Sequence, residues 1–161
     1  MRPLLPARLP SVIAAILPAI LAALLFVAAP PPARAEEPLY ATSGGFALGG
    51  YDAVAYFTRR ASVPGDRRYA VEWRGAVWLF ESAGSMTMFE MDPFRYAPQY
   101  GGYCAYAVAK GRLAPGDPEV FSLVGGRLYL SASRGAAQAW QRDQAGSIAA
   151  ADRNWPGLVK P

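Results

Sequence analysis

Residues 69–80 read YAVEWRGAVWLF, and this stretch decides the fold. Residues 69–73 have the side-chain alternation of a half-buried strand. Arg74-Gly75 supplies a turn, and residues 76–80 return as a second, more apolar strand. The stretch therefore predicts a β-hairpin.

A second hairpin is predicted further along the chain. Residues 120–124 (VFSLV) form its first strand, Gly125-Gly126 its turn and residues 128–130 (LYL) its second strand. Neither an internal repeat nor a block of like charges is apparent in the sequence.

A predicted helix follows each hairpin. Ser82 and Ser133 are suitable N-caps for helices over residues 83–91 and to about residue 142. Asp92-Pro93 ends the first of these, because proline disfavours helical backbone in the residue before it. Shorter helices are expected over 53–57 behind an Asp52 cap, over 104–108 with a strand as the alternative, and from a Ser147 cap to about residue 153. Two hairpins, each followed by a short helix, predict a single small α+β domain.

The N-terminal segment is typical of a secretory signal peptide. Arg2 and Arg8 precede an apolar run over residues 11–29, and prolines then end any helix. Ala33-Arg34-Ala35 has small residues at the two positions that signal peptidase reads. We expect cleavage before Glu36, with an uncleaved membrane anchor as the alternative.

The predicted organisation follows from this cleavage site. It is a signal peptide over 1–35, an extended glycine-rich arm over 36–49 and one domain over 50–158. We expect a protein exported to the periplasm or secreted, with no stable membrane span after cleavage.

Charge excludes one class of partner. Without residues 1–35 the chain keeps thirteen basic residues against twelve acidic ones, a net charge of +1. A near-neutral domain without a basic cluster lacks the electrostatic footprint of a nucleic-acid-binding protein. We therefore expect no nucleic-acid partner.

The histidine and cysteine content narrows the chemistry further. The chain has no histidine, which excludes His-based triads and His-ligated zinc or haem. Its one cysteine, Cys104, cannot form an intrachain disulfide. A single cysteine in an exported protein suggests a free thiol, a mixed disulfide or a covalent partner. A buried, inert cysteine is the alternative.

Three segments resemble the exported branch of the YHS-domain family: GYDAVAYF over 50–57, YAPQYGGYCAY over 96–106 and ADRNWP over 151–156. The resemblance covers residues 50–158. It implies a small α+β unit related to cysteine-rich metal-binding modules. It also implies that some relatives carry selenocysteine at the position of Cys104. Since selenocysteine is hard to explain as core filler, the resemblance favours a reactive Cys104, which we expect to be accessible in the folded protein.

The sequence departs from the metal-binding relatives. Their cysteines stand at positions that look equivalent to Glu81 and Ser85, so the resemblance does not carry a cysteine-rich zinc site to this chain. Thioethers and a thiolate suit Cu(I), although methionines at this spacing are also ordinary core residues. The weak Cu(I) candidates are Cys104, Met86, Met88 and Met91.

Cys104 is the candidate catalytic residue. Gly101-Gly102 permits unusual backbone angles and the close approach of a partner. Tyr103 and Tyr106 are candidate hydrogen-bond donors to the sulfur, and Asp52 is a helix cap with a role in a polar pocket as the alternative. With no second cysteine to resolve a disulfide, any redox cycle needs an external thiol.

Three functions remain open from the sequence. The first is a thiol-dependent redox role for Cys104 with an external partner. The second is a binding module for a soft metal or a small ligand, built around Cys104 and the neighbouring tyrosines. The third is a structural or interaction domain in which Cys104 only packs. The sequence identifies no cofactor.

Overall fold

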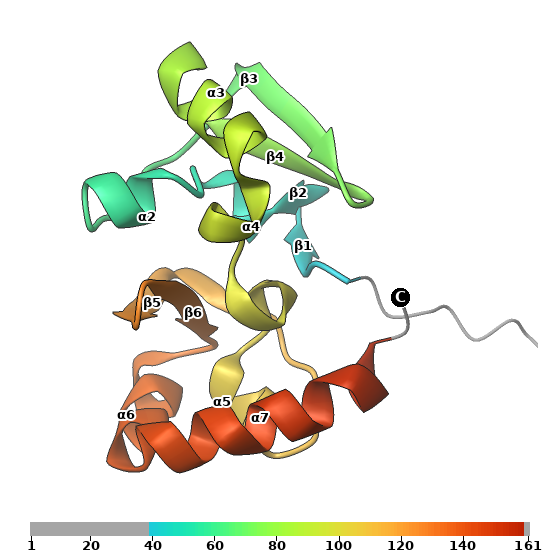
Figure 1. Ribbon diagram of the computed structural model, residues 1–161, viewed down its shortest axis with the longest axis vertical. Helices are drawn as coiled ribbons and strands as arrows, with labels where there is room; N and C mark the ends of the chain where they lie inside the picture. Colours follow the sequence, from blue (N-terminus) through green and yellow to red (C-terminus); the bar gives the residue numbers. More distant parts are fainter. Residues whose placement is uncertain (1–38, 160–161) are drawn as a thin grey trace, which may run out of the picture. The chain divides into compact units, whose positions relative to one another are not determined.

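A computed structural model describes residues 39–159 (Figure 1). The chain divides into two units between residues 35 and 36, and all described residues belong to the second. The predicted signal peptide over 1–35 and the start of the predicted arm lie outside the described residues. Among the residues that are described, no helix is both long and apolar enough to cross a bilayer.

The first half, residues 39–96, is a four-stranded sheet with short helices. Strands β3 and β4 form the predicted hairpin, and β2 adds to β4 in parallel through Phe46 and Val77, giving the order β1-β2-β4-β3. In chain order its elements are β1 (Thr42–Ser43), β2 (Phe46–Ala47), η2 (Leu48–Gly50), α2 (Ala55–Thr58), β3 (Asp66–Trp73), β4 (Ala76–Phe80), α3 (Ala83–Met91) and α4 (Pro93–Tyr96).

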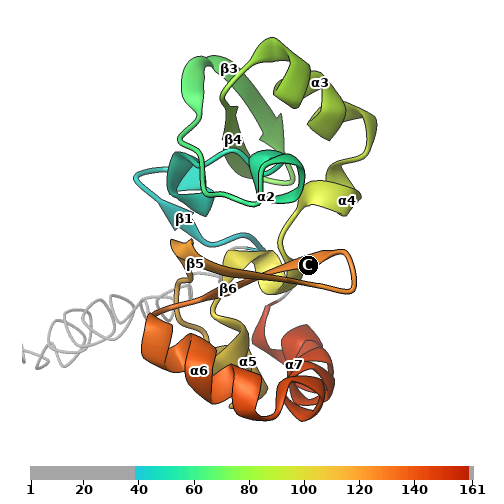
Figure 2. The same ribbon diagram turned by 90° about the vertical axis from the view of Figure 1, so that its left-hand side faces the viewer.

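The second half, residues 97–159, is one hairpin with helices. Figure 2 shows this hairpin between the first half and helices α5, α6 and α7. Its elements are η3 (Gln99–Gly102), α5 (Ala105–Ala109), β5 (Asp117–Val124), β6 (Arg127–Ser131), α6 (Arg134–Arg142) and α7 (Gln144–Leu158).

The α+β class, both hairpins and the helix after each hairpin are confirmed. The two serines cap their helices as predicted. Ser82 Oγ accepts from the N–H of Ser85 at 3.1 Å, and Ser133 Oγ accepts from the N–H of Ala136 at 3.1 Å. The local alternative at residues 104–108 resolves to a helix, α5.

The last predicted helix begins and ends elsewhere. Ser147 lies inside α7, which starts at Gln144 because Asp143 caps it, its Oδ1 accepting from the N–H of Gly146 at 3.0 Å. The helix continues through Pro156 and stops at Leu158. Proline lacks the backbone N–H, so Pro156 removes one helical hydrogen bond, but only in the last turn. The prediction of a Ser147 cap and an end near Arg153 was therefore wrong.

The two halves repeat one local pattern. Each opens with three consecutive residues in the left-handed region, with φ of 52°, 60° and 85° at residues 48–50 and of 52°, 58° and 81° at residues 100–102. An isolated antiparallel bridge follows in each half, pairing Tyr51 with Pro64 and Tyr103 with Pro115. Each hairpin then begins at an aspartate, Asp66 or Asp117, after which the register shifts.

The repeat extends past the hairpins. A nine-residue, serine-capped helix ends at Asp92 in the first half and at Asp143 in the second, and these aspartates cap the next helix from nearly the same backbone conformation. The expectation of no internal repeat was wrong. Its sequence signal is short: Gly-Gly-Tyr at 49–51 and 101–103, and Pro-Gly-Asp at 64–66 and 115–117.

Two apolar clusters form the core. The first includes Trp78 and Phe89 of the first half, together with Leu128 and Leu130 of β6. The second lies within the second half around Trp140. Because β6 contributes to the first cluster, each half buries apolar surface against the other.

Candidate functional site

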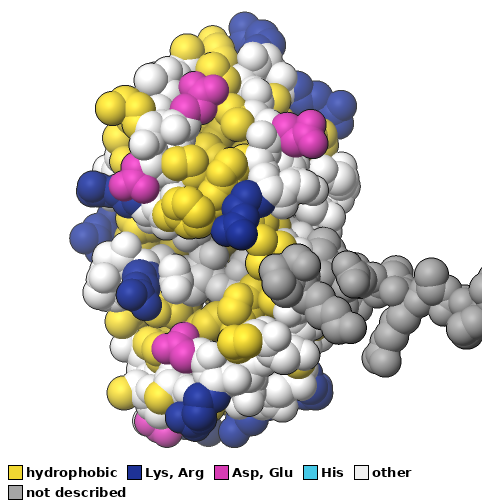
Figure 3. Space-filling view, turned by 45° about the vertical axis from the view of Figure 1, so that its right-hand side comes forward, with side chains coloured by type: hydrophobic (Ala, Val, Ile, Leu, Met, Phe, Trp, Pro, Cys, Tyr) yellow, Lys and Arg dark blue, Asp and Glu magenta, His cyan; other side chains and the backbone are white. Residues whose placement is uncertain are grey.

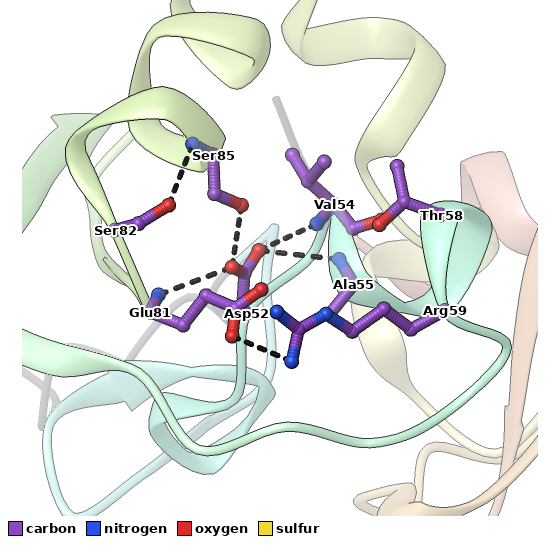
Figure 4. A network of polar contacts seen from close by, with 8 residues as sticks. All are labelled: Asp52, Val54, Ala55, Thr58, Arg59, Glu81, Ser82 and Ser85. Atoms are coloured by element: carbon purple, nitrogen blue, oxygen red, sulfur yellow. Dashed lines mark hydrogen bonds and ion pairs between the residues drawn. The ribbon is translucent and has the colours of Figure 1, made fainter.

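A buried carboxylate organises the first half (Figure 4). Asp52 is fully buried, and its Oδ1 accepts from the N–H groups of Val54 at 2.8 Å and Ala55 at 3.3 Å. Its Oδ2 accepts from the N–H of Glu81 at 3.1 Å and from the Ser85 hydroxyl at 2.5 Å. The side chain thus joins the start of α2 to the end of β4 and the first turn of α3.

The four hydrogen bonds explain why a carboxylate is tolerated in the core. Burying a charged group without partners is very unfavourable, and donors aimed at both oxygens offset that cost. The backbone N–H of Glu81 and the Ser85 hydroxyl therefore serve as donors to one buried carboxylate oxygen. At the surface the Glu81 carboxylate pairs with Arg59 at 3.0 Å (Figure 4). Asp52 is therefore more than the helix cap that the sequence predicts.

Cys104 is the residue of the second half that corresponds to Asp52 in the first half. Both follow Gly-Gly-Tyr, and their N–H groups make matching bonds, Asp52 to the Val63 carbonyl and Cys104 to the Ala114 carbonyl, both at 2.8 Å. By the same repeat Glu81 corresponds to Ala132 and Ser85 to Ala136. The second half thus has a thiol and an alanine at the positions where the first half has a carboxylate and the serine that donates to it.

Cys104 is buried, with 1% of its surface exposed. Its backbone bridges to Leu130 of β6, and α5 begins at the next residue without a backbone N–H donating a capping hydrogen bond to the Cys104 side chain. The expectation of an accessible thiol was wrong, because β6 and the loop at Ala114 cover the segment that the sequence left open.

Gly101 and Gly102 are both buried and both have positive φ. A Cβ atom on Gly101 would collide with the carbonyl oxygen of Leu39, while the Gly101 carbonyl accepts from the N–H of Ala41 at 2.8 Å. The close approach that Gly101 permits is therefore with residues 39–41 of the same chain.

The two candidate tyrosines belong to the second core. Tyr103 is buried with its ring 5.9 Å from that of Trp155. Tyr106 is half-buried, and the Lys110 Nζ lies 5.5 Å from its ring centroid. Tyr103 is a buried member of the second cluster, and Tyr106 packs against that cluster.

The Cu(I) candidates lie on different halves. Met86 packs half-buried against the first core, and Met88 and Met91 are 40% and 81% exposed on α3, whereas Cys104 is buried before α5. Across residues 39–159 no three His, Cys, Asp or Glu side chains come close enough together to hold a metal ion.

A small pocket lies between the two left-handed turns. Its volume is about 20 Å³, room for about one water molecule. It is lined by Ala41, Thr42, Ser43, Leu48, Gly49, Gly102, Pro115, Gly116, Pro118 and Leu130. Cys104 does not line it, and an organic ligand would not fit without movement of the chain.

Sequence analysis missed two buried tyrosines that join distant segments. The Tyr56 hydroxyl donates to the Pro118 carbonyl at 2.9 Å, and the Tyr100 hydroxyl donates to Asp152 Oδ1 at 2.8 Å. Burial raises the pKa of both hydroxyls, and the hydrogen bond to Asp152 raises the pKa of Tyr100 further. No local sequence pattern indicates these two contacts, because their partners are 62 and 52 residues apart in the chain.

Comparisons of the chain with protein-family models, with curated proteins and with solved structures found no match. The resemblance to the YHS-domain family therefore stays a prediction.

Proposed function

We propose that the protein is an exported redox domain in which the Cys104 thiol reacts and an external thiol completes the cycle. One observation carries the proposal: Cys104 occupies the position at which the same chain pattern holds the Asp52 carboxylate. That position in the first half accommodates a negative charge with almost no exposure to water.

By the repeat, the backbone donors that hold Asp52 have counterparts in the second half. The N–H groups of Val54, Ala55 and Glu81 correspond to those of Tyr106, Ala107 and Ala132. A thiolate, or the sulfenate formed from it, places its charge where the carboxylate lies and can accept from N–H groups, whereas a neutral thiol needs no such partner. The site therefore suits a group that alternates between neutral and anionic forms.

The reaction that fits this burial begins with a small hydroperoxide. The Cys104 thiolate attacks the peroxide oxygen, the O–O bond breaks, and the products are a Cys104 sulfenic acid and an alcohol or water. An external thiol then condenses with the sulfenic acid to a mixed disulfide and water. A second external thiol reduces that disulfide and restores Cys104. Because Cys104 is buried, the step with the external thiol requires local opening of the segment around α5.

The burial of Cys104 also favours a second candidate, in which the thiol is a small apolar core residue and the domain serves interaction. The substitution Cys104→Asp separates the two. If the position accepts an anion, this variant should fold and lose no more than about 1–2 kcal/mol of unfolding free energy, because the N–H groups hold the new carboxylate as they hold Asp52. At a purely apolar site the unpaired charge should cost several kcal/mol.

The matched measurement is treatment of the native protein with a hydroperoxide, followed by a thiol and intact mass spectrometry. Formation of a sulfenic acid and then a mixed disulfide, absent in Cys104→Ser, is the expected result. An unfolded Cys104→Asp variant, or a native thiol that reacts only after denaturation, would leave the packing role as the better account.

A further inference from the structure

The first half presents an exposed apolar surface that its own core does not use. On α3 and α4, Met91 is 81% exposed, Phe94 is 69% exposed and Met88 is 40% exposed. The half-buried Trp73 adjoins them, with its ring 5.3 Å from that of Phe94. Figure 3 shows hydrophobic side chains gathered over the first half, with both basic and acidic side chains around them. We call these four residues the α3–α4 surface.

The internal repeat shows that the fold does not need this exposure. Met91, the last residue of α3, corresponds to Arg142, the last residue of α6. Phe94, the second residue after the Asp92 cap, corresponds to Ala145 after the Asp143 cap. The same chain pattern therefore folds with a charged and a small residue at these positions, so the large apolar side chains of the first half call for another role.

The Arg74 side chain lies against the α3–α4 surface. The Arg74 guanidinium carbon lies 5.8 Å from the Trp73 ring centroid and 5.6 Å from that of Phe94. Arg95, next to Phe94, lies over the Tyr96 ring at 5.6 Å. The ion pairs found within residues 39–159 are made by Arg59 and Arg68, and neither Arg74 nor Arg95 takes part in one.

From this combination we infer that the α3–α4 surface docks a protein segment that carries apolar side chains together with carboxylates. Aromatic, methionine and arginine side chains are the residue types enriched at protein interfaces. The two arginines provide charge complementarity to an acidic segment. An extended anionic membrane surface fits less well, because it would also face the exposed Glu90 and Asp92, whereas a single segment needs to bring its carboxylates only to Arg74 and Arg95 beside Phe94. The inference does not depend on the chemistry of Cys104.

The test uses two labelled amphipathic helical peptides, one of leucine and glutamate and its leucine–lysine counterpart, with binding followed by fluorescence anisotropy. The full domain should bind the acidic peptide at least about ten-fold more tightly than the basic one. Arg74→Glu should abolish or reverse this preference, and Phe94→Ala should weaken binding of both peptides. Arg142→Glu, a matched change at the repeat-equivalent position, should bind like the unchanged protein.

Four outcomes would overturn the inference. They are no binding of the acidic peptide, equal binding of both peptides, and binding that survives Phe94→Ala and Arg74→Glu in variants shown to be folded by circular dichroism. The fourth concerns other occupants of the surface. If the unchanged protein sediments with phosphatidylglycerol vesicles and Phe94→Ala does not, the surface binds a membrane. If the unchanged protein forms a concentration-dependent dimer in ultracentrifugation and Phe94→Ala does not, the surface binds a second copy.

Discussion

At the scale of single residues, the most informative pair is Asp52 and Cys104. They occupy equivalent positions in two copies of one pattern, and both are almost fully buried. The carboxylate needs its four donors, because an ion in a protein interior is stable only when it is hydrogen-bonded. The thiol has no such requirement, so the residue corresponding to Ser85, whose hydroxyl donates to Asp52, can be an alanine.

The Asp52 network predicts losses of stability of different size for two substitutions. Ser85→Ala removes one charge-assisted hydrogen bond and should lower the free energy of unfolding by about 1.5–3 kcal/mol. Asp52→Ala should cost more, because it leaves the N–H groups of Val54 and Glu81 and the Ser85 hydroxyl without their acceptor. Urea unfolding measures both changes.

The control for this series is Asp66→Ala. Asp66 pairs with Arg68 at 2.7 Å at the surface, where an ion pair contributes little. A loss of stability in Asp52→Ala no larger than that in Asp66→Ala would show that the buried network does not hold the first half together.

At the scale of elements, capping residues decide where helices begin. Ser82 and Ser133 begin α3 and α6 as the sequence predicts, but α7 begins at Asp143 and not at Ser147. Both Asp143 and Ser147 are good cap residues, so local preference alone does not choose between them. The choice follows from the backbone of Asp143, which leaves the helical region between α6 and α7, with φ of −142° and ψ of 70°, and so brings its side chain to the start of α7.

Two alanine substitutions test this assignment. Asp143→Ala should reduce the free energy of unfolding by about 1 kcal/mol, because the N–H of Gly146 loses its acceptor at the helix start. Ser147→Ala, inside the helix, should leave stability unchanged or raise it slightly. Thermal unfolding followed by circular dichroism gives both values. A larger loss of stability in Ser147→Ala than in Asp143→Ala would indicate that Ser147 is the cap.

At the scale of the whole domain, Tyr56 links the halves. Its ring packs against Phe121 at 4.8 Å, and its hydroxyl donates to the Pro118 carbonyl. Burial of the ring raises the pKa of this hydroxyl above its usual value. The hydroxyl is therefore neutral in the folded protein at pH values where it ionises in the unfolded chain.

This link predicts a loss of stability at alkaline pH. The contribution of Tyr56 is fully present below about pH 10, the pKa of an unperturbed tyrosine, and falls as pH rises above it. Tyr56→Phe should be about 1 kcal/mol less stable at neutral pH, through the lost hydrogen bond, and should lose less stability than the unchanged protein above pH 10. Urea unfolding over a pH series measures both effects. Parallel pH curves for the two proteins would contradict the role given to Tyr56.

The sequence by itself determined the α+β class, both hairpins and the helices that follow them. These features depend on strand alternation, turn residues and serine caps, which act over a few neighbouring residues. The sequence also determined that the redox options rest on one thiol, because Cys104 is the only cysteine in the chain.

The tertiary structure decided which residues lie together and which are covered. Asp52 meets Glu81 and Ser85 because α2, β4 and α3 converge, and this contact joins residues too far apart in the chain for local patterns to reveal. Cys104 is buried because β6 returns to cover it. Burial and convergence depend on contacts between distant segments, and for that reason the burial of Cys104 and the donors around Asp52 emerged only when the chain was folded.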